Sequence, residues 1–130
     1  MRAKLRQLIQ DRQLQSIAAR PRHQSGSAAI GHDHFEYVDA LSFSVSYQEI
    51  FLNRAYHFLS DHPAPRILDC GANIGLAGCY WKRVYPGARI TAFEPDPLIA
   101  AVLRRNLAAW GGADVEVVEA AVSDRAGAAH

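Results

Sequence analysis

Two short motifs contain the residues of this chain whose types and spacing suit ligand binding. The first is ILDCGANIG at residues 67–75, and the second is FEPD at residues 93–96. The first reads as a buried strand that runs into a glycine loop, and the second places an acid at the end of a later strand. A glycine loop suits a ligand that touches backbone. A carboxylate at a strand end can accept hydrogen bonds from a ribose diol. Together the motifs indicate a cofactor that contains a nucleoside.

The glycine loop lacks one feature of the loops that bind a pyrophosphate. Those loops read G-x-G-x-x-G, and the middle glycine makes room for the phosphates. Asn73 holds that position here. Its side chain would crowd a pyrophosphate, but it can hydrogen-bond an amino acid carboxylate or the loop itself. S-adenosylmethionine has no phosphate, so the loop favours that cofactor over a dinucleotide, and a nicotinamide-dependent oxidoreductase is the weaker interpretation.

Three acids near these motifs have different predicted roles. Glu94 follows Gly71 by 23 positions, close to the spacing of a ribose-binding acid. We therefore interpret Glu94 as a ribose ligand rather than a solvated strand-end acid. Asp96, directly before Pro97, is interpreted as a helix cap. Asp69 could contact the cofactor's ammonium group, directly or through water, or it could stabilise the loop amides, and these two roles are compatible.

From residue 66 onward the pattern alternates between strand and helix. Strands are predicted at 67–68, 89–93 and 115–121, and helices at 75–85 and from 97 to a stop at Gly111-Gly112. Such a succession predicts a parallel sheet with right-handed crossovers and strand order 3-2-1. The fold class is therefore α/β, a partial Rossmann-like fold, and residues 63–130 form an incomplete cofactor-binding domain.

Residues 1–62 are predicted to form a helical N-terminal segment with a short hairpin. The spacing predicts a helix over 3–19 with a thin apolar stripe, and residues 21–31 read as a linker. Alternation over 35–38 and 41–45 indicates two short strands that pair as a hairpin. Ser46 and Glu49 match a capping box, so a helix is expected from there to about Ser60.

Composition sets limits on function. The 130 residues fit about one domain, and a net charge of +1 gives no general argument for binding nucleic acid. The first 22 residues are basic, which we interpret as a solvated helix rather than a membrane or RNA contact.

Two cysteines without metal-type pairing fit a reduced, cytoplasmic setting. No apolar run is long enough to span a membrane. His32-Asp33-His34 is interpreted as a polar loop, so no metal is expected.

The residues after the third strand could border a base. Backbone amides over 120–124 would reach the adenine edge in such a fold. Asp124 could accept a hydrogen bond from the adenine amino group, or it could be an exposed loop acid, and both interpretations stay open.

These motifs, together with AAVSD at 120–124 and SYQEIF at 46–51, resemble the FkbM-type methyltransferases over about residues 35–127. The resemblance implies a class I enzyme that depends on S-adenosylmethionine, and in most cases an O-methyltransferase. Carried over by position, Glu94 would hold the ribose, and Tyr47 and Glu49 would help to close the site. The remaining cofactor contacts would come from two groups, the methionine side at Asp69, Gly71, Ala72, Asn73 and Gly75, and the adenine side at Ala121, Val122 and Asp124.

The chain also departs from that family. A class I methyltransferase sheet has seven strands, whereas this sequence stops just after the third, so we expect a truncated chain that is inactive alone. The expected parent reaction is methylation of a hydroxyl on a sugar, glycan or small metabolite, with no residue assigned as the catalytic base. The alternative is a non-catalytic nucleotide-binding or interaction module. An unpaired edge on the first strand also predicts self-association.

Overall fold

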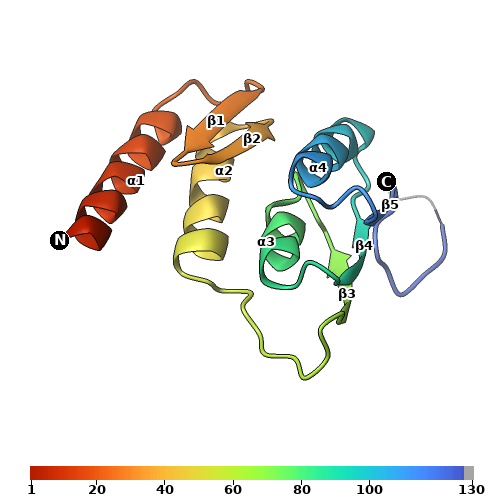
Figure 1. The fold of residues 1–130 in the computed structure, drawn as a ribbon. Helices are drawn as coiled ribbons and strands as arrows, with labels where there is room; N and C mark the ends of the chain where they lie inside the picture. The colour runs from red at the N-terminus through yellow and green to blue at the C-terminus, as the bar shows by residue number, and fades with distance from the viewer. Residues whose placement is uncertain (128–130) are drawn as a thin grey trace. The chain divides into compact units, whose positions relative to one another are not determined.

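The computed structural model describes residues 1–127 and divides the chain into two compact units (Figure 1). The first unit comprises Met1–Asn53, and the second begins at Arg54. Each unit has its own sheet and its own buried side chains. The two units are therefore described separately.

The first unit consists of a long helix, a hairpin and a second helical segment. Its elements are α1 (Arg2–Ala18), β1 (Gly26–Ile30), β2 (Asp33–Tyr37), α2 (Ala40–Tyr47) and the π-helical turn η1 (Gln48–Leu52). The predicted N-terminal helix is confirmed. β1 and β2 pair antiparallel across a two-residue turn in which Gly31 has a φ of 62°. Aromatic rings fill the core of this unit, where Tyr47 and Phe51 stack with their centroids 4.8 Å apart.

The predicted hairpin was wrong in its second strand and in its pairing, whereas its first strand, expected at 35–38, overlaps β2. Residues 26–30, which read as a linker, form β1, and residues 41–45 lie in a helix. Asp39 explains the difference, because its carboxylate accepts a hydrogen bond from the Ser42 amide at 3.1 Å and caps α2. Phe43 and Tyr47 are then one helical turn apart and both are buried. The alternation of apolar residues over 41–45 was too short to distinguish a strand from a buried helix.

The predicted capping box was also wrong. Ser46 lies inside α2, and the helical segment ends at Leu52 instead of near Ser60. Residues 53–65 contain no helix, and Leu59, within the range predicted as helix, is 89% exposed. Arg54 has a φ of 56°, a conformation that ends the helical path.

The second unit is a three-stranded parallel sheet with two helices. Its elements are β3 (Arg66–Cys70), α3 (Leu76–Val84), β4 (Arg89–Phe93), α4 (Pro97–Ala109) and β5 (Glu116–Val118). The strands lie in the order β3-β4-β5. Ile67, Asp69, Ile90 and Ala92 are buried on the face that the helices cover. The other face leaves Arg66, Leu68 and Cys70 exposed. The α/β class and the alternation of strands and helices are confirmed.

The ends of α4 follow the predicted signals. The Asp96 carboxylate accepts from the amides of Leu98 and Ile99, and Pro97 is the first helical residue. At the other end Gly111 has a φ of 72°, and the Gly112 amide donates to the Leu107 carbonyl at 2.7 Å. This pattern is a Schellman motif, which satisfies the last carbonyls of the helix.

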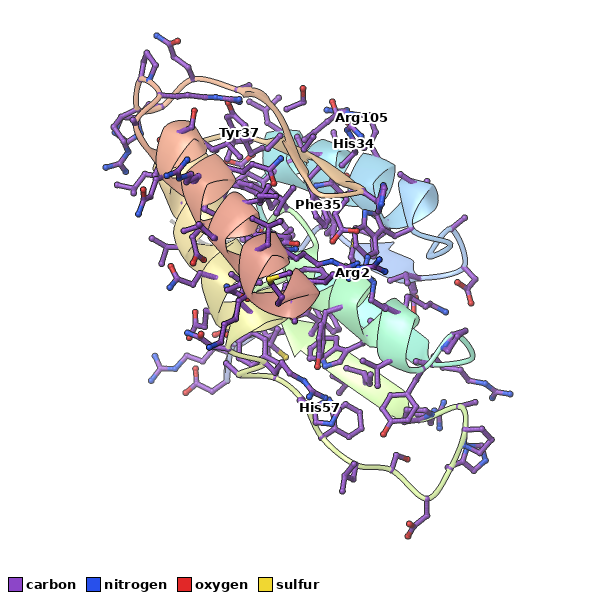
Figure 2. The ribbon with its side chains drawn as sticks, turned by 60° about the vertical axis from the view of Figure 1, so that its left-hand side comes forward. Arg2, His34, Phe35, Tyr37, His57 and Arg105 are labelled. Atoms are coloured by element: carbon purple, nitrogen blue, oxygen red, sulfur yellow. The ribbon has the colours of Figure 1, made fainter. Side chains whose placement is uncertain are left out.

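Aromatic side chains of α3 hold the extended segment that precedes β3. The Tyr80 hydroxyl lies 2.9 Å from Nδ1 of His57, which Figure 2 labels on that segment. Trp81 donates its indole N–H to the Tyr56 carbonyl at 3.1 Å, and the Tyr85 hydroxyl donates to the Phe58 carbonyl at 3.0 Å. These rings therefore pack this segment of the chain onto α3.

Candidate functional site

The glycine loop is fastened to the end of β4 by its own backbone. The amides of Gly71 and Ala72 both donate to the Phe93 carbonyl, at 3.0 and 2.8 Å. Three loop residues have a positive φ, at 86° for Gly71, 50° for Asn73 and 91° for Gly75. The loop therefore makes a tight turn over the carboxyl ends of two neighbouring strands, where ligands bind in parallel sheets.

Glu94 holds this turn in place from the end of β4. Glu94 is only 7% exposed. Its two carboxylate oxygens accept hydrogen bonds from the amides of Asn73 and Asp96, both at 3.0 Å. The carboxylate thus joins the glycine loop to the start of α4, a structural role that the spacing alone did not reveal. Each oxygen keeps a second lone pair. Its predicted contact with a ribose stays a prediction.

Asp69 lies beside this loop with an unsatisfied oxygen. The residue is 9% exposed, and no donor within the described part of the chain reaches its buried Oδ2. Burial raises the pKa of the carboxyl to about 6. Buried carboxylate oxygens are rarely left without a partner, because the loss of hydration is not compensated. This atom is therefore suited to a donor that the chain itself does not supply.

The two glycines at the ends of the loop have different surroundings. A Cβ on Gly71 would meet no atom within 4 Å, so its backbone faces open space. A Cβ on Gly75 would lie 2.7 Å from Cδ1 of Leu103. Gly75 thus allows close packing of the start of α3 against α4. Gly71 leaves room for a ligand to approach the backbone.

One residue that supports the loop was missed by the sequence analysis. Asn106 on α4 is 3% exposed, and its Nδ2 donates to the Ile74 carbonyl at 2.8 Å. Its position among the buried residues Leu103 and Leu107 was a usable signal, because a buried amide needs a specific partner.

The predicted adenine-side residues lie in the segment after β5. Ala121, Val122 and Asp124 are all exposed. The Asp124 carboxylate accepts from the neighbouring Ser123 hydroxyl at 3.4 Å. A hollow of about 470 Å³ is lined by Pro95 and, from this segment, by Glu119, Ala120, Ala121, Ser123 and residues 125–127, so that Ala121 borders it and Val122 and Asp124 do not. The structure thus brings this segment next to the residue that follows Glu94, while its contact with a base stays a prediction.

Other predicted features can be placed within residues 1–127. Tyr47 is buried in the first unit and donates to Asp33 at 3.1 Å, whereas Glu49 is exposed. Their predicted part in closing the site stays a prediction. In this range no three His, Cys, Asp or Glu side chains group to hold a metal ion, and Cys70 and Cys79 form no disulfide. No helix in the same range is both long and apolar enough to cross a membrane.

Comparison with known proteins identifies methyltransferases as relatives. The chain is 52% identical over 62 residues to Methyltransferase sdnD of Sordaria araneosa, which covers 48% of the chain and 24% of the relative. It is 38% identical over 93 residues to the 31-O-demethyl-FK506 methyltransferase FkbM of Streptomyces tacrolimicus, covering 70% and 35%. It is 40% identical over 70 residues to the 2-O-methyltransferase NoeI of Sinorhizobium fredii, covering 53% and 28%.

These matches cover only part of each relative. The chain spans about a quarter to a third of the length of the relatives named above, and no family model matches it. The names of these relatives nevertheless all describe methyltransferases. The resemblance is confirmed, and this chain is a homologue of methyltransferases, the FkbM enzyme among them.

Proposed function

We propose that the chain is the cofactor-binding part of an S-adenosylmethionine-dependent methyltransferase. The observation that carries this proposal is the buried, unpartnered Oδ2 of Asp69 beside the glycine loop. The ammonium group of the cofactor's methionine part is a donor of the right charge for that atom. The relatives are methyltransferases, which supports the same cofactor.

The residues of the loop fit the rest of such a cofactor. The open space over Gly71 admits a ligand close to the backbone, and Ala72, Asn73 and Gly75 complete the turn. Glu94 would accept the ribose hydroxyls with its remaining lone pairs, since its other lone pairs already hold the loop. Ala121, which lines the hollow next to Pro95, would border the adenine together with Val122 and Asp124.

The chemistry itself resides in the cofactor, which carries a methyl group on a positively charged sulfur. Attack must be in line with the methyl–sulfur bond, so the protein contributes mainly orientation. We propose an oxygen acceptor, a hydroxyl of a sugar, glycan or small metabolite, because one relative is named as a 2-O-methyltransferase and another as the methyltransferase of a 31-O-demethyl compound. The described residues include none that we assign as the base.

We further propose that residues 63–130 are one half of a larger doubly wound sheet, with these strands in the order 3-2-1, in a cytoplasmic enzyme. The chain spans about a third or less of its relatives, so turnover would need parts of the enzyme beyond these three strands. The 130 residues alone would then bind the cofactor weakly, and the edge of β3 would favour self-association. A clean monomer in light scattering at high concentration would contradict that self-association.

The rival is a non-catalytic nucleotide-binding module. Isothermal titration with S-adenosylhomocysteine and, separately, with NADH tests the choice of cofactor. We expect S-adenosylhomocysteine to bind with a dissociation constant near the millimolar range, about −4 kcal/mol, and NADH not to bind. Equal or tighter binding of NADH would contradict the proposed cofactor, whereas micromolar binding of S-adenosylhomocysteine by a monomer would contradict only the weak-binding part.

A pair of variants tests the proposed ribose contact. Glu94→Gln should weaken S-adenosylhomocysteine about tenfold, because an amide cannot accept at both positions. Asp61→Asn, at an exposed acid outside the loop, is the matched control and should bind as the unmodified chain does. Circular dichroism confirms that both variants are folded. Unchanged binding in folded Glu94→Gln would show that the ribose role is wrong.

A further inference from the structure

Helix α1 carries apolar side chains on two opposite sides. At 100° per residue, Leu5, Leu8 and Ile9 fall within an arc of about 100°, and Leu14 and Ile17 lie roughly 160° away from its centre. The sequence had suggested a single thin apolar stripe along this helix, formed by Leu5, Leu8, Ile9 and Ile17. The structure separates them, because Leu14 and Ile17 are 6% and 3% exposed whereas Leu5, Leu8 and Ile9 are 57%, 51% and 49% exposed.

Only the second half of α1 is used by its own unit. Leu14 accepts a hydrogen bond from the Ser44 hydroxyl through its carbonyl, and Gln13 accepts from the Gly31 amide. Residues 1–9 are all exposed. The first turns of the helix therefore present an apolar face that the folding of this unit does not require.

This apolar face is flanked by positive charge. Two cations lie on either side of this face, Lys4 on one side and Arg2, which Figure 2 labels at the start of α1, on the other. Arg6 lies next to Arg2, farther from the apolar face. Arg12 lies on the apolar face itself, one helical turn after Leu8. No ion pair involves these four side chains within residues 1–127. The nearby acid, Asp11, accepts a hydrogen bond from Gln7.

The sequence favoured a solvated helix here, but the exposed apolar face changes that interpretation. We propose that this face of α1, defined by Leu5, Leu8 and Ile9 and flanked by Arg2, Lys4, Arg6 and Arg12, docks on an anionic phospholipid surface. An apolar stripe with cations along its margins lets a helix lie flat at the boundary between headgroups and acyl chains. Arg12 can extend its guanidinium to the phosphates while its methylenes stay with the leucines. The helix lies on the membrane and does not cross it.

Charge and apolarity together favour this occupant over a nucleic acid. An RNA backbone would engage the cations but would leave three large apolar side chains in water. A lipid surface satisfies both, because its phosphates pair with the cations and its acyl region takes up the leucines. This inference is independent of the proposed methyl transfer, since it concerns the first unit alone.

Flotation of the full chain with lipid vesicles tests the proposal. One set of vesicles contains phosphatidylcholine alone, and the other contains about one third phosphatidylglycerol. We expect the chain to float with the anionic vesicles at low salt, and the bound fraction to fall at least about fivefold with phosphatidylcholine alone or at high salt.

Two variants with the same type of substitution separate insertion from simple attraction. The triple variant Leu5→Gln, Leu8→Gln and Ile9→Gln should lose about tenfold or more in vesicle binding. Ala3→Gln, exposed on another side of the same turns, should bind as the unmodified chain does. Glutamine is a good helix former, so circular dichroism should be unchanged.

Three results would overturn the proposal. The first is no flotation with anionic vesicles, which would mean that these side chains do not bind a lipid surface and would favour a protein groove as their partner. The second is undiminished flotation of the triple variant, which would mean adsorption by charge alone. The third is tighter binding to RNA than to anionic vesicles with no effect of the triple variant.

Discussion

The two units each bury one aspartate to a similar extent, but the hydrogen bonding of the two carboxylates is opposite. Asp39 in the first unit is 7% exposed, and Asp69 in the second is 9% exposed. The carboxylate of Asp39 accepts from Arg22 at 3.0 Å, from the His23 amide at 2.7 Å and from both the amide and the hydroxyl of Ser42. Oδ2 of Asp69 accepts from nothing within residues 1–127. Asp39 therefore stabilises its unit through hydrogen bonds, whereas Asp69 has a buried acceptor that no donor of the described chain satisfies.

The pKa values of the two acids move in opposite directions. The Arg22 guanidinium, with the amide and hydroxyl donors, holds the pKa of Asp39 well below its usual range. Burial raises the pKa of Asp69 to about 6. Asp39 therefore stabilises its unit above its unfolded pKa of about 4, and this contribution is lost as the pH falls. For Asp69 the stability is greatest below about pH 4 and is lost as the pH rises through about 6.

The same difference recurs between two glycines of the loop. Gly75 is surrounded by packed atoms of α4, whereas Gly71 faces open space. A protein that leaves one buried carboxylate oxygen without a partner and open space beside Gly71 at the same strand end gives up stability there. Ligand binding is a physical reason for that loss, and the following substitutions separate the packed positions from the open ones.

The largest effect is expected for Gly75→Ala. Its φ of 91° disfavours any side chain, and the new Cβ would overlap Cδ1 of Leu103. We expect the free energy of unfolding to fall by about 3 kcal/mol, measured by urea denaturation. A decrease below about 1 kcal/mol would show that Gly75 is not a packed position.

A smaller effect of opposite sign is expected for Asp69→Asn. Removing the buried charge should raise the free energy of unfolding by about 2 kcal/mol at pH 8 and by little below pH 4. Urea denaturation at several pH values measures this. The matched variant Asp39→Asn should instead lower stability at pH 8. If both variants change stability in the same direction, the comparison between the two acids fails.

The smallest change in stability is expected for Gly71→Ala. The open space around it leaves only the cost of a positive φ, about 1 kcal/mol. The methyl group would, however, enter the space that we assign to the cofactor. Calorimetry should therefore show S-adenosylhomocysteine binding reduced by about tenfold or more. Unchanged binding in this variant would place the ligand elsewhere.

The structure of the second unit agrees closely with the prediction because the sequence signals there are strong and local. The Asp96-Pro97 start and the Gly111-Gly112 stop of α4 each correspond to a defined set of backbone hydrogen bonds. The glycine loop follows a short strand, as its sequence indicated, but only alternate residues of that strand are buried, and Leu68 is 71% exposed. The unpartnered oxygen of Asp69 could not be predicted, because it depends on which donors the fold brings near.

The first unit was harder to predict because its decisive contacts are distant in sequence. Asp39 caps α2 while it binds Arg22 and His23, which lie 16 or 17 positions earlier. The five residues from Leu41 to Val45 alternate as a strand would, and no local feature outweighs that pattern. The role of Asn106 was missed for the same reason, since its partner Ile74 is 32 positions away.

The central claim is that Asp69 keeps its carboxylate for a cationic group of the cofactor. Carbon-detected NMR of the Asp69 carboxyl, titrated with pH in the absence and presence of S-adenosylhomocysteine, tests this claim most directly. We expect a midpoint of about 6 in the free chain and a lower midpoint with the ligand, because its ammonium group favours the charged form. A midpoint near 4 in the free chain, or one that saturating ligand does not move, would contradict the account.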